Sequence, residues 1–201
     1  MNVQLSKKNI SFKKILTANA NVISGKKPVA VKIYRLDKKE DKGYFDKLPN
    51  KDSWKNADLI DAVQEHFDTD TGDNIRKFYS MEDYWGNCLG VMESIDLPNR
   101  VNQINYLETC PEFAQKNKKR RIKYIGETMI AFATQMSSNR NDSSVKIRKP
   151  LTKSMPFYLD KCFFEKPVNK SSKMLILPNT KFDLLLEQNL RHTKNRMEYL
   201  G

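Results

Sequence analysis

The chain has 201 residues, and its 36 Lys and Arg against 24 Asp and Glu give a net charge of +12. Charged residues make up 30% of it and hydrophobic residues 39%, and ten Phe, eight Tyr and eight Met can fill a core, which argues against a disordered chain. Three widely spaced cysteines and only two histidines argue against a structural zinc site.

The first 20 residues have lysines interrupting their apolar stretches, so they do not resemble a secretory signal. The sequence also has no run of about 18 apolar residues that would span a membrane. We therefore expect a soluble cytoplasmic protein with free thiols and no membrane partner. Residues 1–27 are predicted to be an N-terminal arm, whose order the sequence does not decide, and residues 28–201 a single domain.

Apolar and polar residues alternate over residues 29–36, which predicts a strand, and apolar residues recur at helical spacing over residues 52–67, which predicts a helix. The middle of the chain then predicts three strands, over residues 75–83, 88–98 and 101–110. A helix over 122–137 and a further strand over 144–148 follow them. The last strand–helix–strand unit of this series would be a right-handed crossover between parallel strands.

The last third of the chain predicts a short helix over residues 152–164, a hairpin over 163–178 and an amphipathic helix over 182–200. Strands in a row beside single crossover helices predict an α+β fold with a mixed, mostly antiparallel central sheet flanked by helices. The apolar stripe of the final helix would pack on its own domain or on a second copy of the chain, so a homodimer is compatible with the sequence.

The stretch RIKYIGETMIAFATQM, residues 121–136, combines a core-facing apolar stripe with a glycine near its start. Gly126 would cost about 1 kcal/mol relative to Ala in a helix interior. In the first turn of a helix, however, a missing Cβ lets a ligand approach backbone N–H groups that have no partner in the helix. With the basic run KNKKRR directly before it, this turn is a candidate phosphate-binding site.

Three segments resemble the GNAT family of acyl-CoA-dependent N-acetyltransferases. RIKYIG is similar to its R/Q-x-x-G-x-G/A motif, with Arg121 first, Gly126 last, and Tyr124 where the family has a glycine. FYLDKCFF resembles its FYEKxGF segment, with Cys162 in place of glycine, and INYLETCPEF resembles the strand before its pyrophosphate loop. The element order over residues 29–178 is also similar to that of the family.

The resemblance implies acetyl-CoA as co-substrate, bound between two splayed strands, and no metal. The backbone N–H groups of a first-turn segment would bind the pyrophosphate, namely those of Lys123, Tyr124, Ile125, Gly126, Glu127 and Thr128, with charge added by Arg121 and Lys123. The pantetheine arm would run along a bulged strand at Leu107, Glu108 and Thr109, opposite residues 145–148. The side chain of Glu127 is expected to face solvent.

The resemblance also implies a direct attack by a primary amine on the thioester in a ternary complex. Tyr158 matches the tyrosine that protonates the departing thiolate. Glu108 and Glu93, on neighbouring predicted strands, are candidates for the general base. Glu108 would share a strand face with Tyr106 and Cys110, because side chains alternate along a strand.

Two other functions fit the same residues. A basic nucleic-acid-binding protein without chemistry would use the charge of +12, although the basic residues are spread along the chain. A degenerate GNAT fold without catalysis would explain Tyr124 and Cys162 at glycine positions. If the chain is an enzyme, its basic surface would suit an amine carried by an acidic macromolecule.

Overall fold

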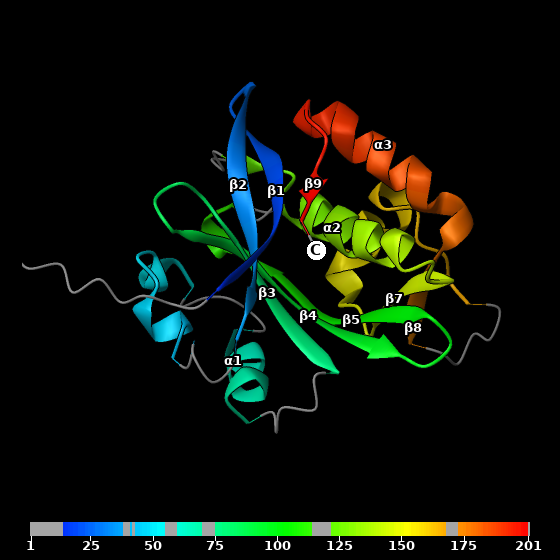
Figure 1. Cartoon of the computed structure of the whole chain (residues 1–201), viewed down its shortest axis with the longest axis horizontal. Coiled ribbons are helices and arrows are strands. Elements are labelled where there is room, and N and C mark those ends of the chain that lie inside the picture. The colour runs from blue at the N-terminus through cyan, green and yellow to red at the C-terminus, as the bar shows by residue number, and fades with distance from the viewer. Residues whose placement is uncertain are drawn as a thin grey trace, which may run out of the picture.

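The computed structural model describes residues 14–37, 41, 43–54, 60–69, 75–113, 122–167 and 173–200. The predicted cofactor residue Arg121 and the basic residues 116–120 before it lie outside these ranges, as do residues 1–13 of the predicted arm. In the described part of the chain, one sheet runs in the order β6-β1-β2-β3-β4-β5-β7-β8, and β9 pairs with β1 (Figure 1).

The strands of this sheet are β1 (Ile15–Ser24), β2 (Lys27–Leu36), β3 (Arg76–Glu82), β4 (Cys88–Leu97), β5 (Val101–Thr109), β6 (Ile122–Lys123), β7 (Ser144–Arg148), β8 (Met174–Pro178) and β9 (Glu198–Tyr199). The α-helices of the described residues are α1 (Ile60–Thr69), α2 (Ile125–Asn139) and α3 (Phe182–Thr193). Neighbouring strands are antiparallel, with the exception of β5 and β7, which are parallel. The predicted α+β class and mostly antiparallel sheet are confirmed.

Two hydrophobic clusters lie on opposite faces of the sheet, because strand side chains alternate between faces. The larger cluster joins the sheet to α2 and α3, and the smaller one joins it to α1 and to two short 3₁₀ turns, Phe45–Lys47 and Lys51–Trp54 (Figure 1). In β4, Cys88 to Ser94 are all buried. This strand is therefore the centre of the molecule.

Helix α2 is the crossover between the parallel strands β5 and β7, as the sequence predicted. Met129, Phe132 and Ala133 of its predicted apolar stripe are 0% exposed. Helix α3 lies against α2 and buries Phe182 and Leu185. The stripe that made a homodimer compatible with the sequence therefore packs on its own domain.

Residues 15–24 of the predicted N-terminal arm, whose order the sequence left open, form β1 inside the sheet. The buried residues Ala18, Ala20 and Val22 alternate with Asn19 and Asn21. This is a strand pattern, but alanine and asparagine are depleted in strands, so the signal is weak.

The final predicted helix ends early, at Thr193. Lys194 has a φ of 61° and adopts the left-handed conformation that often ends a helix. The chain then extends, and Glu198 and Tyr199 pair with Asn19 and Ala18 of β1. The predicted helix over 152–164 is likewise shorter, with a 3₁₀ turn at Thr152–Ser154 and a π turn at Phe157–Lys161.

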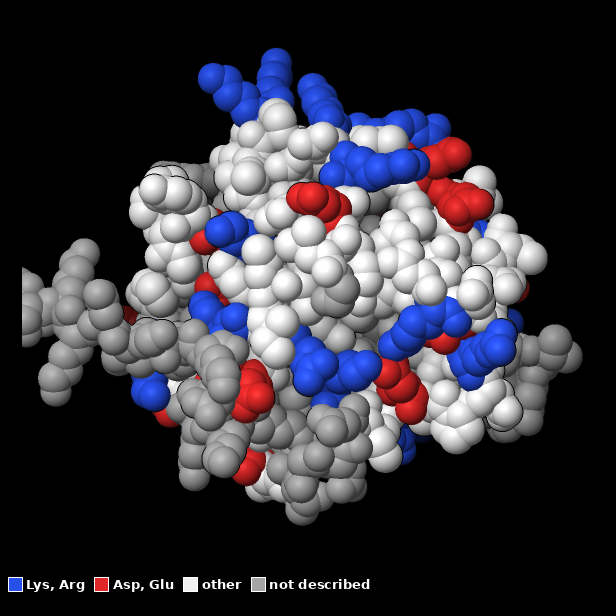
Figure 2. Space-filling model, in the orientation of Figure 1, with Lys and Arg blue, Asp and Glu red and all other residues white. Residues whose placement is uncertain are grey.

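Basic side chains lie in separate groups, with acidic ones among them, on the face of the molecule that Figure 2 shows. This arrangement matches the even distribution of Lys and Arg along the sequence. In the described residues, no helix has the length and apolar character needed to cross a membrane.

Buried tyrosines and thiols lead to a prediction about alkaline stability. Burial raises the pKa of Tyr44 and Tyr79, and it raises the pKa of the free thiol of Cys110 to about 11. These groups lose their protons more readily in the unfolded chain, whose ordinary pKa values are about 8.5 for Cys and about 10 for Tyr. Their contribution to stability is therefore complete below those values and is lost as pH rises through the folded-state pKa.

We expect Tm, followed by circular dichroism, to fall continuously between about pH 8 and about pH 11. The variant Cys110→Ser should show a shallower fall at the start of this range. A Tm that stays constant across the range would contradict the prediction.

Candidate active site

Strand β5 contains a bulge and then separates from β7. In its pairing with β4, Glu93 lies opposite Tyr106 and Ser94 opposite Ile104, so Asn105 is the extra residue of a β-bulge. The parallel pairing with β7 ends at Ile104 and Ile147, although β5 continues to Thr109. The splayed pair of strands that the resemblance implied is therefore present.

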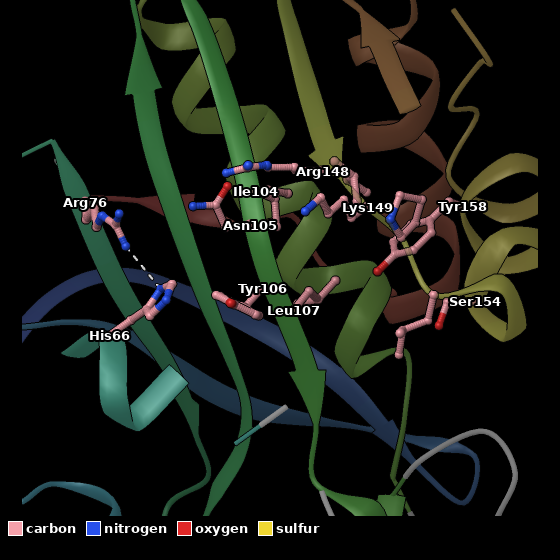
Figure 3. Close-up of a pocket in the computed structure, with 13 residues that line it drawn as sticks. His66, Arg76, Ile104, Asn105, Tyr106, Leu107, Arg148, Lys149, Ser154 and Tyr158 are labelled. Atoms are coloured by element: carbon pink, nitrogen blue, oxygen red, sulfur yellow. Dashed lines mark hydrogen bonds between the residues drawn. The ribbon is translucent and has the colours of Figure 1, made fainter. Parts of the chain in front are cut away.

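A cavity of about 300 Å³ lies at this separation (Figure 3). The strands and the chain after β7 supply most of its lining, namely Ile104, Asn105, Tyr106, Leu107, Ile147, Arg148, Lys149, Pro150 and Leu151. The rest comes from α1, β3 and the turns after β7, namely His66, Arg76, Ser154 and Tyr158. None of the described residues that line the cavity is acidic, and four of them carry a basic side chain.

Tyr158 lies on the π turn Phe157–Lys161 and is 7% exposed. In Figure 3, Tyr158 and Ser154 lie on one side of the cavity, and His66 and Arg76 on the other. Burial, followed by the thiol of Cys162 and the carboxylate of Glu108, raises the pKa of Tyr158 above that of an ordinary tyrosine. The phenol therefore keeps its proton at neutral pH.

Gly126 lies in the first turn of α2, where the three segments of the sequence resemblance meet. A Cβ on this residue would lie 3.3 Å from Cζ of Phe157 and 3.6 Å from Oγ1 of Thr109. The start of α2 therefore contacts both the end of β5 and the turn that carries Tyr158. Of the predicted pantetheine residues, Leu107 lines the cavity and Thr109 lies against Gly126.

Tyr124 keeps the backbone conformation that a glycine would favour at this position. Its φ of 69° and ψ of 14° are left-handed, a conformation that costs a non-glycine residue about 1–2 kcal/mol. The ring stacks on His192 of α3, with 4.7 Å between the ring centroids and 17° between the planes. Tyr124 thus adopts a backbone conformation that suits glycine and adds a contact with α3.

The expectation that Glu127 faces solvent is wrong, since this residue is 4% exposed. Its carboxylate lies 2.9 Å from Nδ1 of His192 and accepts a 3.5 Å hydrogen bond from Asn189. Both partners are on α3, which covers this side of α2 and lies far from it along the chain. The sequence around Glu127 does not indicate that α3 covers this side chain.

The other predicted phosphate-binding residues have different environments. The backbone N–H of Thr128 donates to the carbonyl of Tyr124 at 2.8 Å, so it is occupied by the first hydrogen bond of the helix, and its inclusion in the phosphate site is wrong. The N–H groups of Ile125, Gly126 and Glu127 precede this bond and have no partner within the helix. Lys123 is exposed and pairs with Ile23 in the sheet.

The candidate base Glu93 is 0% exposed and does not line the cavity. Its Oε1 accepts a 2.9 Å hydrogen bond from Nδ2 of Asn105, and its Oε2 lies 3.1 Å from Nδ1 of His66. Arg76 adds a charge 3.6 Å from Oε1. The second candidate, Glu108, is half-buried opposite Val91 on the face of β5 that also carries Tyr106.

The sequence did not single out several cavity residues, above all His66, Arg76 and Asn105. His66 is a lone histidine on α1, and its proximity to Glu93 depends on how α1 packs on the sheet. The bulge at Asn105 depends on strand register, for which the sequence carries no separate signal. Among the described residues, no group of three or more His, Cys, Asp or Glu side chains is arranged to hold a metal ion.

No protein-family model matches the sequence, and no curated protein sequence matches it either. Solved structures do match. AtaT complexed with acetyl-methionyl-tRNAfMet is 14% identical, with a TM-score of 0.54 over 77% of this chain and 98% of the other.

Two further matches agree with this one. A mutant of the AtaT toxin bound to the C-terminus of the antitoxin AtaR and acetyl-CoA is 13% identical, with a TM-score of 0.53 over 78% and 98% of the two chains. A chimera of the spermidine N-acetyltransferase SpeG from Vibrio cholerae and hSSAT is 15% identical, with a TM-score of 0.51 over 76% and 97%. The chain therefore has the fold of the GNAT-family acetyltransferases.

Proposed function

We propose that the protein is an N-acetyltransferase that transfers the acetyl group of acetyl-CoA to a primary amine. The observation that carries this proposal is the opening between β5 and β7, which begins at the Asn105 bulge and contains Tyr158. A bulged strand that is unpaired along one edge offers backbone groups to a linear ligand and donors to a thioester oxygen. The acetyl-CoA bound to the AtaT mutant supports the choice of co-substrate.

The chain offers acetyl-CoA three kinds of contact. The first-turn N–H groups of Ile125, Gly126 and Glu127 would bind the pyrophosphate at the positive end of the α2 dipole. Lys123, and Arg121 beside it in the sequence, would add positive charge. The pantetheine arm would lie along Leu107–Thr109, within the part of β5 that β7 leaves unpaired.

The transfer would proceed by direct attack in a ternary complex. The amine nitrogen forms a bond to the thioester carbonyl carbon, and the carbon–sulfur bond breaks as the tetrahedral intermediate collapses. Tyr158 donates its proton to the departing thiolate. Burial raises the pKa of this phenol, but the thiolate leaves into the same buried space, where loss of hydration also makes it more basic.

The charge of the cavity favours an acceptor with negative charge near its amine. Arg148 and Lys149 line the cavity with no acidic residue in the described lining, whereas Arg76, which also lines it, is paired with the buried Glu93. Such a wall repels a polyamine and attracts an amine carried by an acidic macromolecule. The acetyl-methionyl-tRNA bound to AtaT is an example of such a carrier in a structure of the same fold.

A thermal shift tests the co-substrate directly. Acetyl-CoA at a hundred times its Kd should stabilise the protein by about 2.7 kcal/mol. For a chain of this length, that corresponds to a rise in Tm of about 5–10 °C. AMP at the same concentration is the control for non-specific anion binding. If neither acetyl-CoA nor other acyl-CoAs at millimolar concentration raise Tm, the proposed function is wrong.

A further inference from the structure

The cavity contains a histidine whose position is fixed by a buried carboxylate. His66 lines the cavity with a side chain that is 34% exposed, whereas Glu93 behind it is 0% exposed. Nδ1 of His66 lies 3.1 Å from Oε2 of Glu93. A ligand in the cavity can therefore reach the imidazole but not the carboxylate behind it.

We assign the proton of His66 to Nδ1, which lies 3.1 Å from both Oε2 of Glu93 and a guanidinium nitrogen of Arg76. A carboxylate only accepts hydrogen bonds, so the ring nitrogen facing it, Nδ1, is the protonated one. Arg76 also approaches Nδ1, at 3.1 Å, but a guanidinium only donates and cannot bond a protonated nitrogen. Arg76 instead acts as a counter-ion of Glu93, 3.6 Å from Oε1. The unprotonated Nε2 of His66 is then the nitrogen available to a ligand.

The β-bulge also contributes to this arrangement. Asn105, its extra residue, donates a 2.9 Å hydrogen bond to Oε1 of Glu93 and accepts one of 2.8 Å from Gln103. The ring of His66 packs edge-on against Tyr106, with 5.2 Å between the centroids. The same irregularity that opens β5 toward β7 therefore holds the carboxylate that orients the histidine.

We propose that Nε2 of His66 is the general base that takes a proton from the acceptor ammonium, and that Glu93 and Asn105 are positioning residues. This inference rests on the proposed acetyl transfer. It replaces Glu93 as the base, because a carboxylate that is 0% exposed and bonded at both oxygens cannot touch the substrate.

Protons enter and leave the reaction at opposite sides of the cavity, with His66 on the side of α1 and Tyr158 beyond β5 (Figure 3). The ammonium gives one proton to Nε2 of His66, which passes it to solvent. The neutral amine attacks the carbonyl carbon, the carbon–sulfur bond breaks, and Tyr158 protonates the thiolate. The second proton lost by the nitrogen returns through water to Tyr158, so one proton is released per acetyl group transferred.

Two small nucleophiles distinguish a base from a merely structural histidine. Ethylamine is protonated at neutral pH and must lose a proton before it attacks, whereas hydroxylamine is largely neutral already. We expect His66→Gln to lower kcat/KM for ethylamine by about 100- to 10,000-fold, the usual contribution of a general base. Acetylation of hydroxylamine should change by less than about threefold, since no base is needed before attack.

Matched variants complete the test, with release of the CoA thiol as the readout. Glu93→Gln should show the same selective loss for ethylamine. The glutamine amide, unlike the carboxylate, does not require that Nδ1 of His66 carries the proton. Glu65→Gln, an exposed substitution on the same helix, should leave both rates unchanged. The Tm shift with acetyl-CoA should be retained in all three variants, which shows that they are folded and bind the co-substrate.

Each other result overturns the inference. Equal rates for His66→Gln and wild type with ethylamine would exclude His66 as the base. An equal loss with both nucleophiles would indicate a structural role, and a selective loss in Glu108→Gln instead would make Glu108 the base. If wild type binds acetyl-CoA but acetylates neither nucleophile, the proposed transferase function fails, and the inference fails with it.

Discussion

Gly126→Glu is expected to abolish the rise in Tm that acetyl-CoA causes, while the free protein stays folded. A carboxylate in the first turn of α2 interacts favourably with the helix dipole, so it does not oppose folding electrostatically. The same charge occupies the place proposed for the pyrophosphate and repels it. Thermal shift measurements should therefore show a change in Tm near zero at a concentration that shifts wild type by about 5–10 °C.

Two control substitutions separate the charge of this side chain from its bulk. Gly126→Gln has nearly the same size without the charge, and Gly126→Ala places only a Cβ at 3.3 Å from Phe157. We expect Ala to retain most of the shift, Gln to retain part of it and Glu to retain none. A full shift in Gly126→Glu would mean that the pyrophosphate binds elsewhere than at the start of α2.

Tyr158→Phe is expected to reduce kcat by about 100- to 10,000-fold without changing the Tm shift by acetyl-CoA. The ring would keep its contacts with Phe157 and Phe164, whose centroids lie 5.1 and 6.0 Å away, so only the hydroxyl is lost. Because burial raises the pKa of Tyr158, the wild-type phenol should remain a proton donor up to at least about pH 10, the range of an ordinary tyrosine.

The matched control is Tyr79→Phe. Tyr79 is also buried and lies against Phe132 of α2, but it does not line the cavity. Its loss of a hydroxyl should leave kcat unchanged. If Tyr158→Phe retains the wild-type rate, Tyr158 is a core residue. If wild type binds acetyl-CoA but releases no CoA thiol with any amine, the chain is a GNAT fold without catalysis.

The sequence predicted those parts of the fold that depend on local pattern. The strands near 29–36, 75–83 and 144–148 are rich in β-branched or aromatic residues, and α2 has a continuous apolar stripe. Strand β1 was missed because its inward residues are partly alanine and its outward ones asparagine. The helix predicted over residues 182–200 was too long, because nothing in the sequence near Lys194 indicates a residue in the left-handed conformation.

The candidate site was predictable only as far as its motifs are local. Gly126 and Tyr158 were found through segments of a few residues, and the structure brings these segments together. The pair of Glu93 and His66 joins residues 27 apart whose contact depends on a bulge and on the packing of α1. The burial of Glu127 depends in the same way on α3, whose His192 lies 65 residues further along the chain.

The pairing of β9 with β1 has a consequence for synthesis of the chain. Ala18 lies opposite Tyr199, which follows it by 181 residues, so β1 lacks one of its neighbours until that residue has been synthesised. During that interval, the described pairing of this edge is that of β6 with Ile23 and Ser24. Unpaired strand edges recruit other chains, so the nascent protein is prone to aggregate in the interval before β9 appears.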